Sequence, residues 1–84
     1  MTTKIENAQL YWDDQDPAAE GWWLRWTENG SECGTDLDGD RDADLETLAE
    51  LALEICDAEE VSVYAAGREN VCLRARADGR SRWL

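Results

Sequence analysis

The residues of this chain that could carry chemistry are almost all carboxylates. The sequence holds 20 aspartates and glutamates against 8 lysines and arginines, and it contains no histidine. It shows no GxSxG nucleophile motif, no glycine-rich phosphate loop and no zinc-ligand spacing. Its three cysteines, Cys33, Cys56 and Cys72, lack the basic partner that activates a thiol. We therefore expect a protein that is not an enzyme, with no catalytic residues and no cofactor.

The densest carboxylate pattern is an aspartate at every second position over residues 36–44. These aspartates are Asp36, Asp38, Asp40, Asp42 and Asp44. The first three match positions 1, 3 and 5 of an EF-hand or dockerin-type calcium loop, but Arg41 and Thr47 replace its glycine and its bidentate acid. The sequence therefore favours a solvated acidic turn that ends in a helix cap. A calcium site formed by Asp36, Asp38, Asp40 and Asp44 is the less favoured alternative.

A second carboxylate pattern follows on a predicted helix, where Glu46, Glu50 and Glu54 are spaced four residues apart. This spacing places them on one face with a rise of about 6 Å per step. Like charges so placed destabilise a helix by about 0.2–0.5 kcal/mol per pair, and no lysine or arginine is interleaved. The row has no evident structural reason, so we interpret it as a binding surface. An ordinary solvated helix face is the alternative.

The two patterns together suit a basic partner. Carboxylates in steps of about 6 Å, extended by the aspartates, are similar in arrangement to the phosphates of one nucleic-acid strand. Such a row would fit the basic groove that a protein keeps for DNA or RNA. The predicted partner-binding residues are Asp36, Asp38, Asp40, Asp42, Asp44, Glu46, Glu50, Glu54, Asp57 and Trp23.

The elements that must position these residues follow from the hydrophobic alternation. Strands are predicted over residues 6–12, 22–27 and 31–37, with Asn29-Gly30 as a hairpin turn. A helix capped by Asp42 or Asp44 runs to Cys56, and strands over 61–65 and 71–75 follow it. Asp78-Gly79 adds a short final strand over 80–84. The sequence thus predicts a single α+β domain over 1–84, an antiparallel sheet of five or six strands with one helix on one face, in the order β-β-β-α-β-β.

The same patterns predict which side chains are buried. The apolar stripe of the helix is Leu45, Leu48, Ala49, Ala52, Ile55 and Cys56, widened by Leu51 and Leu53, so the helix should press broadly onto the sheet. Most of the five tryptophans should lie in the core, because the chain has no phenylalanine. Trp23 alternates to the opposite face from Trp22 and Trp26. We expect it either exposed, as an interface hot spot, or covered by the C-terminal segment.

Charge and cysteine content limit the possible binding partners and the cellular compartment. Residues 1–63 contain 18 acids and three bases, whereas residues 64–84 contain five arginines and two acids. With a net charge of −12, direct nucleic-acid binding is not expected, so the C-terminal arginines should pair with the acidic surface of the same chain or contact a second subunit. Three cysteines without CxxC spacing predict reduced thiols, with Cys56 and Cys33 buried and Cys72 outward. The sequence has no apolar signal-peptide region and no membrane span, which favours the cytoplasm.

In charge pattern and layout, the chain resembles the small acidic phage proteins that inhibit bacterial defence, namely the anti-CRISPR and DNA-mimic proteins. The resemblance rests on the acidic row over residues 36–54 on a compact sheet-and-helix body. It implies an inhibitor in the host cytoplasm that occupies a positively charged nucleic-acid-binding site of a defence complex. The partner would be a basic nucleic-acid-binding protein or complex, with no direct nucleic-acid contact and no membrane, and the chain would be a monomer or homodimer.

Two further resemblances point to antitoxin or immunity functions. The layout is similar to that of HicB-type antitoxins, in which strands precede a helix that opens like DADLETLAELA over residues 42–52. The chain lacks the separate DNA-binding segment that many of those antitoxins carry. An immunity protein that neutralises a basic nuclease toxin is the other alternative.

Overall fold

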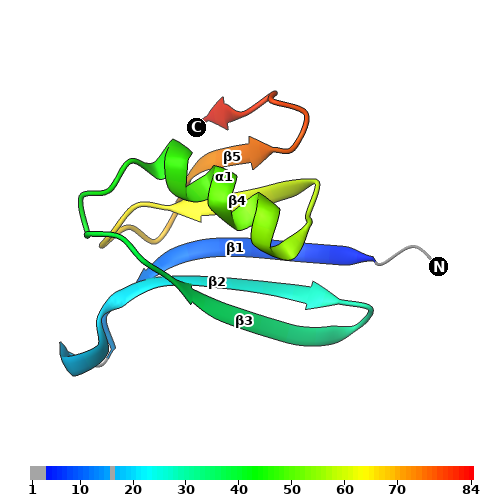
Figure 1. The fold of residues 1–84 in the computed structure, drawn as a ribbon. Coiled ribbons are helices and arrows are strands. Elements are labelled where there is room, and N and C mark those ends of the chain that lie inside the picture. The colour runs from blue at the N-terminus through cyan, green and yellow to red at the C-terminus, as the bar shows by residue number, and fades with distance from the viewer. Residues whose placement is uncertain (1–3, 16) are drawn as a thin grey trace.

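The fold is a twisted six-stranded sheet with one helix on one face (Figure 1). The computed structural model describes residues 4–15 and 17–84. Within these residues the elements are β1 (Ile5–Asp13), the 3-10 turn η1 (Pro17–Ala19), β2 (Gly21–Glu28), β3 (Ser31–Leu37), α1 (Leu45–Cys56), β4 (Glu60–Tyr64), β5 (Val71–Arg76) and β6 (Arg82–Trp83). The predicted α+β class, the single helix and the sixth strand are confirmed.

The order of strands across the sheet is β3-β2-β1-β4-β5-β6. Among the described strands, neighbours are antiparallel except for β1 and β4, which run parallel with Gln9 opposite Ser62 and Leu10 opposite Val63. The prediction of a wholly antiparallel sheet is therefore wrong at its centre. Alternating hydrophobicity determines which face a side chain takes, but it carries no information on strand direction. Direction here depends on α1, which carries the chain from β3 to the free edge of β1.

The β2–β3 hairpin forms at the predicted Asn29-Gly30 turn. Both residues have positive φ, 50° and 86°, as a two-residue turn between strands requires. The backbone N–H of Asn29 donates to the carbonyl of Lys4 at 2.9 Å, and its Oδ1 accepts from the backbone N–H of Lys4 at 3.0 Å. The turn is thereby tied to the start of β1. Asn7, also at positive φ (54°), lies in a bulge of β1 that the regular alternation did not predict.

The core lies between α1 and the centre of the sheet. Leu10, Leu24, Val61, Val63 and Leu73 are fully buried on the sheet, and the helix adds Leu48, Ala49, Ala52 and Cys56. The two alanines let the helix backbone approach the strands closely. Helix α1 packs on β1, β4 and β5 and leaves β2 and β3 largely uncrossed (Figure 1).

One flank of the helix is less buried than predicted. Leu51 and Ile55 are 44% and 48% exposed, and Leu53 is only half-buried. The prediction that the whole apolar stripe presses onto the sheet is wrong for Leu51 and Ile55. The helix is centred over the middle strands, so the edges of a wide stripe extend beyond the area that those strands can cover.

Candidate acidic binding surface

The aspartate-rich loop between β3 and α1 is fixed to the core through backbone contacts. The carboxylates of Asp38, Asp40 and Asp42 are not needed to hold it in place. The indole Nε1 of Trp22, a buried core residue, donates to the carbonyl of Asp40 at 2.8 Å. Gly39 packs against the same core, because a Cβ there would lie 3.3 Å from both Trp22 and Leu48. The side chains of Asp38, Asp40 and Asp42 are exposed. The core thus fixes the loop and presents its charges to solvent.

Asp36 lies in β3 rather than in this loop. It lies opposite Trp23 in the β2–β3 ladder, whereas the next residue, Leu37, is buried opposite Trp22. Directly opposed residues of a ladder share a face, so Asp36 and Trp23 lie on the face of the sheet away from α1. The predicted single acidic row is therefore divided between two faces of the molecule.

The calcium alternative gains no support from this arrangement. Over residues 4–15 and 17–84, no three carboxylates or thiolates gather closely enough to hold a metal ion, and this includes Asp36, Asp38, Asp40 and Asp44. Asp44 has a structural role instead. It is the N-cap of α1, with Oδ1 accepting from the backbone N–H of Glu46 at 3.2 Å and Oδ2 accepting from the Thr47 hydroxyl at 3.1 Å. Of the two predicted caps, Asp44 is the correct one.

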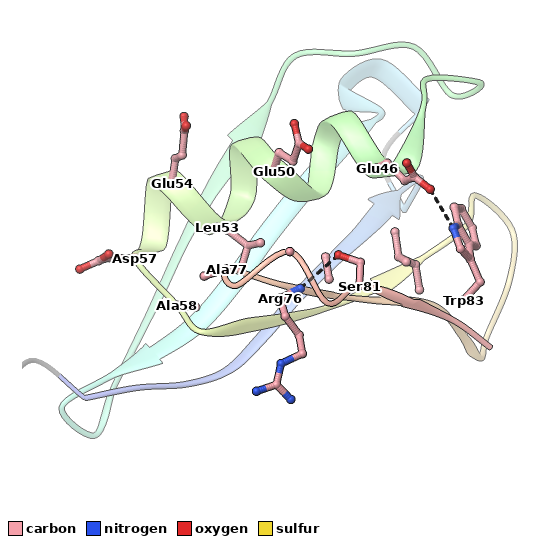
Figure 2. Close-up of a pocket in the computed structure, with 13 residues that line it drawn as sticks. Glu46, Glu50, Leu53, Glu54, Asp57, Ala58, Arg76, Ala77, Ser81 and Trp83 are labelled. Atoms are coloured by element: carbon pink, nitrogen blue, oxygen red, sulfur yellow. Dashed lines mark hydrogen bonds between the residues drawn. The ribbon is translucent and has the colours of Figure 1, made fainter.

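Two acids of the helix also have structural roles that sequence reasoning missed. Glu46 accepts a hydrogen bond from Nε1 of Trp83 at 2.8 Å, which ties β6 to the first turn of α1 (Figure 2). Asp57 ends the helix in the left-handed conformation, with φ 55°. The interpretation that the whole glutamate row lacks a structural reason is therefore wrong for Glu46.

Glu50 and Glu54 form no side-chain hydrogen bond or ion pair with another residue in the part of the chain that the structure describes. Both are exposed on α1, and Figure 2 shows their carboxylates pointing away from the sheet. The ion pairs among the described residues are Lys4–Glu6, Arg25–Glu32, Arg76–Glu60, Arg76–Asp78 and Arg80–Asp78. None of them involves residues 36–57, so no ion pair among the described residues neutralises the carboxylates of the loop and the helix.

Two of the C-terminal arginines, Arg76 and Arg80, form internal ion pairs, but their partners do not belong to the acidic loop and helix, whereas the prediction of internal pairing required partners there. Arg76 lies 3.6 Å from Glu60 and 3.7 Å from Asp78, and Arg80 lies 4.0 Å from Asp78. These contacts are local to β4, β5 and the turn after β5. At the other edge of the sheet, the hydrogen bond and charge of Glu32 raise the pKa of the exposed Arg25.

A groove of about 670 Å³ runs between α1 and the β5–β6 hairpin (Figure 2). One wall is the helix, with Glu50, Glu54 and Asp57 at its rim and Leu53 directed inward. The other wall includes Ala77 and Trp83 from the hairpin. No pattern in the sequence predicts this groove, because the residues of its two walls are far apart in the chain. The one available signal was Leu53, an apolar residue placed among the glutamates.

Trp23 lies on the opposite, uncovered face of the sheet, and it is half-buried. Its ring packs closely against β3 at Gly34, where a Cβ would lie 2.6 Å from Cζ2 of the indole. The alternative that the C-terminal segment covers Trp23 is wrong, since β5 and β6 occupy the far edge of the sheet. Trp23 therefore does not share a surface with Glu50 and Glu54.

The three thiols are free, as predicted. Cys56 is buried, its Sγ donates to the carbonyl of Ala52 at 3.1 Å, and burial raises the pKa of this thiol. Cys33 and Cys72 are both half-buried, so the predictions of a buried Cys33 and an outward Cys72 each hold only in part.

The candidate acidic surface thus comprises Glu50 and Glu54 of α1, with the groove beside them, and the exposed Asp38, Asp40 and Asp42 of the preceding loop. Of these, Asp38 also lines a hollow with Asp36 and Trp23. None of the helices in residues 4–15 and 17–84 has the length and apolar character that a membrane crossing requires. Comparison of the chain with protein-family models, curated proteins and solved structures finds no significant match.

Proposed function

We propose that the protein is a non-enzymatic inhibitor that occupies a positively charged nucleic-acid-binding site on another protein, such as a bacterial defence complex. The observation that carries this proposal is the pair Glu50 and Glu54, two exposed carboxylates on α1 that form no ion pair with any of the described residues. The exposed aspartates of the loop before α1 extend the same charge.

Energetics supports a binding role for this pair. Two glutamates four residues apart cost the helix about 0.2–0.5 kcal/mol, which a lysine at either position would recover. A net charge of −12 adds general self-repulsion to a chain of 84 residues. The compensating advantage is a strong negative field, which steers a basic partner and speeds its association.

The geometry supports a basic protein as the partner rather than a nucleic acid. Phosphates would be repelled by the loop and the helix, whereas a lysine- and arginine-lined groove would meet a row of fixed carboxylates. The scaffold needs no rearrangement to present them, because the core holds both the loop, through Trp22 and Gly39, and the helix. A preorganised surface loses little entropy on binding.

The test is capture of partners from a bacterial lysate with three forms of the protein, at low and high salt. The forms are the native chain, Glu50→Gln/Glu54→Gln, and the control Glu28→Gln/Glu69→Gln, which removes the same charge from exposed positions at the end of β2 and in the loop between β4 and β5. We expect a captured protein that binds DNA or RNA by itself and loses it when the native chain binds. The E50Q/E54Q form should bind it at least tenfold more weakly, and the control should bind within about twofold of the native chain.

Two results would contradict the proposal. One is equal binding by the two double variants, which would mean that only overall charge matters. The other is a captured protein that keeps its nucleic acid while bound to this chain. The E50Q/E54Q form should melt at the same or a slightly higher temperature than the native chain, so weaker binding cannot be assigned to unfolding.

A further inference from the structure

We infer that the groove between α1 and the β5–β6 hairpin binds a short basic segment of the partner that also carries an apolar side chain. This inference rests on the proposed function and names the part of the partner that is recognised. Glu50 and Glu54 lie at the rim of this groove, but its interior is separate from their carboxylates, which point away from the sheet (Figure 2).

The lining of the groove has an accessible apolar part. Leu53 is half-buried and points from the helix into the groove, and Ala77 is exposed on the opposite wall. Trp83, which is 54% exposed, closes one end and is held there by its hydrogen bond to Glu46. Leu53 and Trp83 thus present apolar surface that a ligand side chain can remove from water.

The charge around this apolar surface selects a cation. Glu50, Glu54 and Asp57 line the helix wall, and none of them takes part in an ion pair among the described residues. The one basic residue in the lining, Arg76, is engaged by Glu60 and Asp78. Lysine and arginine combine an aliphatic stem with a charged head, so they match a groove with an apolar interior and an acidic rim.

A segment with both basic and apolar residues fits this groove better than a second copy of the chain. Two copies would each bring a net charge of −12, which opposes their association. A partner whose nucleic-acid site includes a basic, partly apolar strand or loop would meet complementary charge at the rim and apolar contact inside. The helix surface and the groove would then bind adjacent parts of the same partner.

The experiment titrates the native, isotope-labelled chain with two peptides and follows backbone amide shifts by NMR. The peptides are acetyl-Arg-Leu-Arg-Leu-Arg-amide and acetyl-Arg-Gly-Arg-Gly-Arg-amide, which have equal charge. We expect the leucine peptide to shift amides over residues 50–58 and 73–83 and to bind at least about tenfold more tightly, because a leucine side chain enters the groove.

Two variants separate this inference from the proposed function. Ala77→Trp fills the groove without removing a carboxylate or a core side chain, so it should abolish the difference between the peptides. The E50Q/E54Q form keeps the groove and should weaken both peptides alike. Circular dichroism checks that each variant is folded, and the comparison of peptides on the native chain stands even if the Ala77→Trp form does not fold.

Three outcomes would overturn the inference. They are equal affinity for the two peptides, amide shifts confined to residues outside the groove walls, and a concentration-dependent dimer whose interface is this groove. If the peptides bind equally while E50Q/E54Q still loses the lysate partner, the groove inference fails and the proposed function stands. If E50Q/E54Q retains the lysate partner while the leucine peptide still enters the groove, the proposed function fails instead.

Discussion

At the scale of single residues, Trp23 and Gly34 show how the uncovered face of the sheet is organised. The indole of Trp23 packs against the backbone of the neighbouring strand at Gly34, where any side chain would collide with the ring. Trp23 is also the partner of Tyr11 across the β1–β2 ladder. A glycine inside a strand is otherwise unfavourable, so its place here is explained by this close approach.

We predict that Gly34→Ala destabilises the fold by about 1 kcal/mol, because the new Cβ displaces the ring of Trp23. Urea unfolding measures the loss, and a red shift of the tryptophan emission reports the exposed ring. Gly21→Ala is the matched control, since a Cβ at that position would meet no atom within 4 Å. In a Trp23→Ala background, Gly34→Ala should no longer be destabilising. A loss that persists there would show that the ring is not its cause.

At the scale of elements, α1 depends on contacts outside its own sequence. Its first turn is capped by Asp44 and tied to β6 through the hydrogen bond between Glu46 and Trp83. Its last turn ends at Asp57 in the left-handed conformation. The helix contains no basic residue in its last turn, so these contacts and its buried face must stabilise it.

We predict that Asp44→Ala lowers the free energy of unfolding by about 1 kcal/mol, because the backbone N–H of Glu46 and the Thr47 hydroxyl lose their acceptor. Chemical denaturation measures this change. Asp42→Ala removes the same charge two residues earlier, at an exposed position, and should change stability by less than about 0.5 kcal/mol. Equal effects of the two substitutions would mean that charge, not capping, determines the result.

The elements were largely predictable from the sequence, and the contacts between them were not. Predicted residues 31–37 coincide with β3, and the helix ends at Cys56 as expected, because alternation and helical periodicity are local signals. The bond between Glu46 and Trp83 joins residues 37 positions apart, and no local signal announces it. The same holds for the groove and for Trp23 on Gly34. The acidic charge of the candidate site could therefore be predicted from the sequence. The division of its carboxylates between two faces of the molecule could be seen only in the folded structure.

At the scale of the whole molecule, the dominant property is unequal charge. The loop before α1 and the helix form an unpaired acidic side, whereas the ion pairs of the described residues lie on the strands and at the turn after β5. The carboxylates on the candidate binding side therefore repel one another, and favourable contacts elsewhere in the fold must offset this repulsion. It also makes the stability of the protein sensitive to ionic strength.

We predict that the melting temperature rises between about 10 mM and 150 mM sodium chloride, because salt screens repulsion among the carboxylates. Differential scanning calorimetry measures the rise. The E50Q/E54Q form should show a smaller rise than the native chain, because it carries two fewer charges while the hydrogen bond between Glu46 and Trp83 is kept. A melting temperature that falls with salt would show that attractive ion pairs outweigh the repulsion.

The parallel pairing of β1 with β4 also determines when the sheet can be completed during synthesis. The chain leaves the ribosome from its N-terminus, so β1, β2 and β3 can pair as an antiparallel meander once Leu37 has emerged. The other edge of β1, at Gln9 and Leu10, then lacks its β4 partner until Ser62 and Val63 have also emerged. Unpaired edges invite pairing with other chains. The nascent protein is therefore most prone to aggregate over the lengths between Leu37 and Tyr64, before its central strands can join.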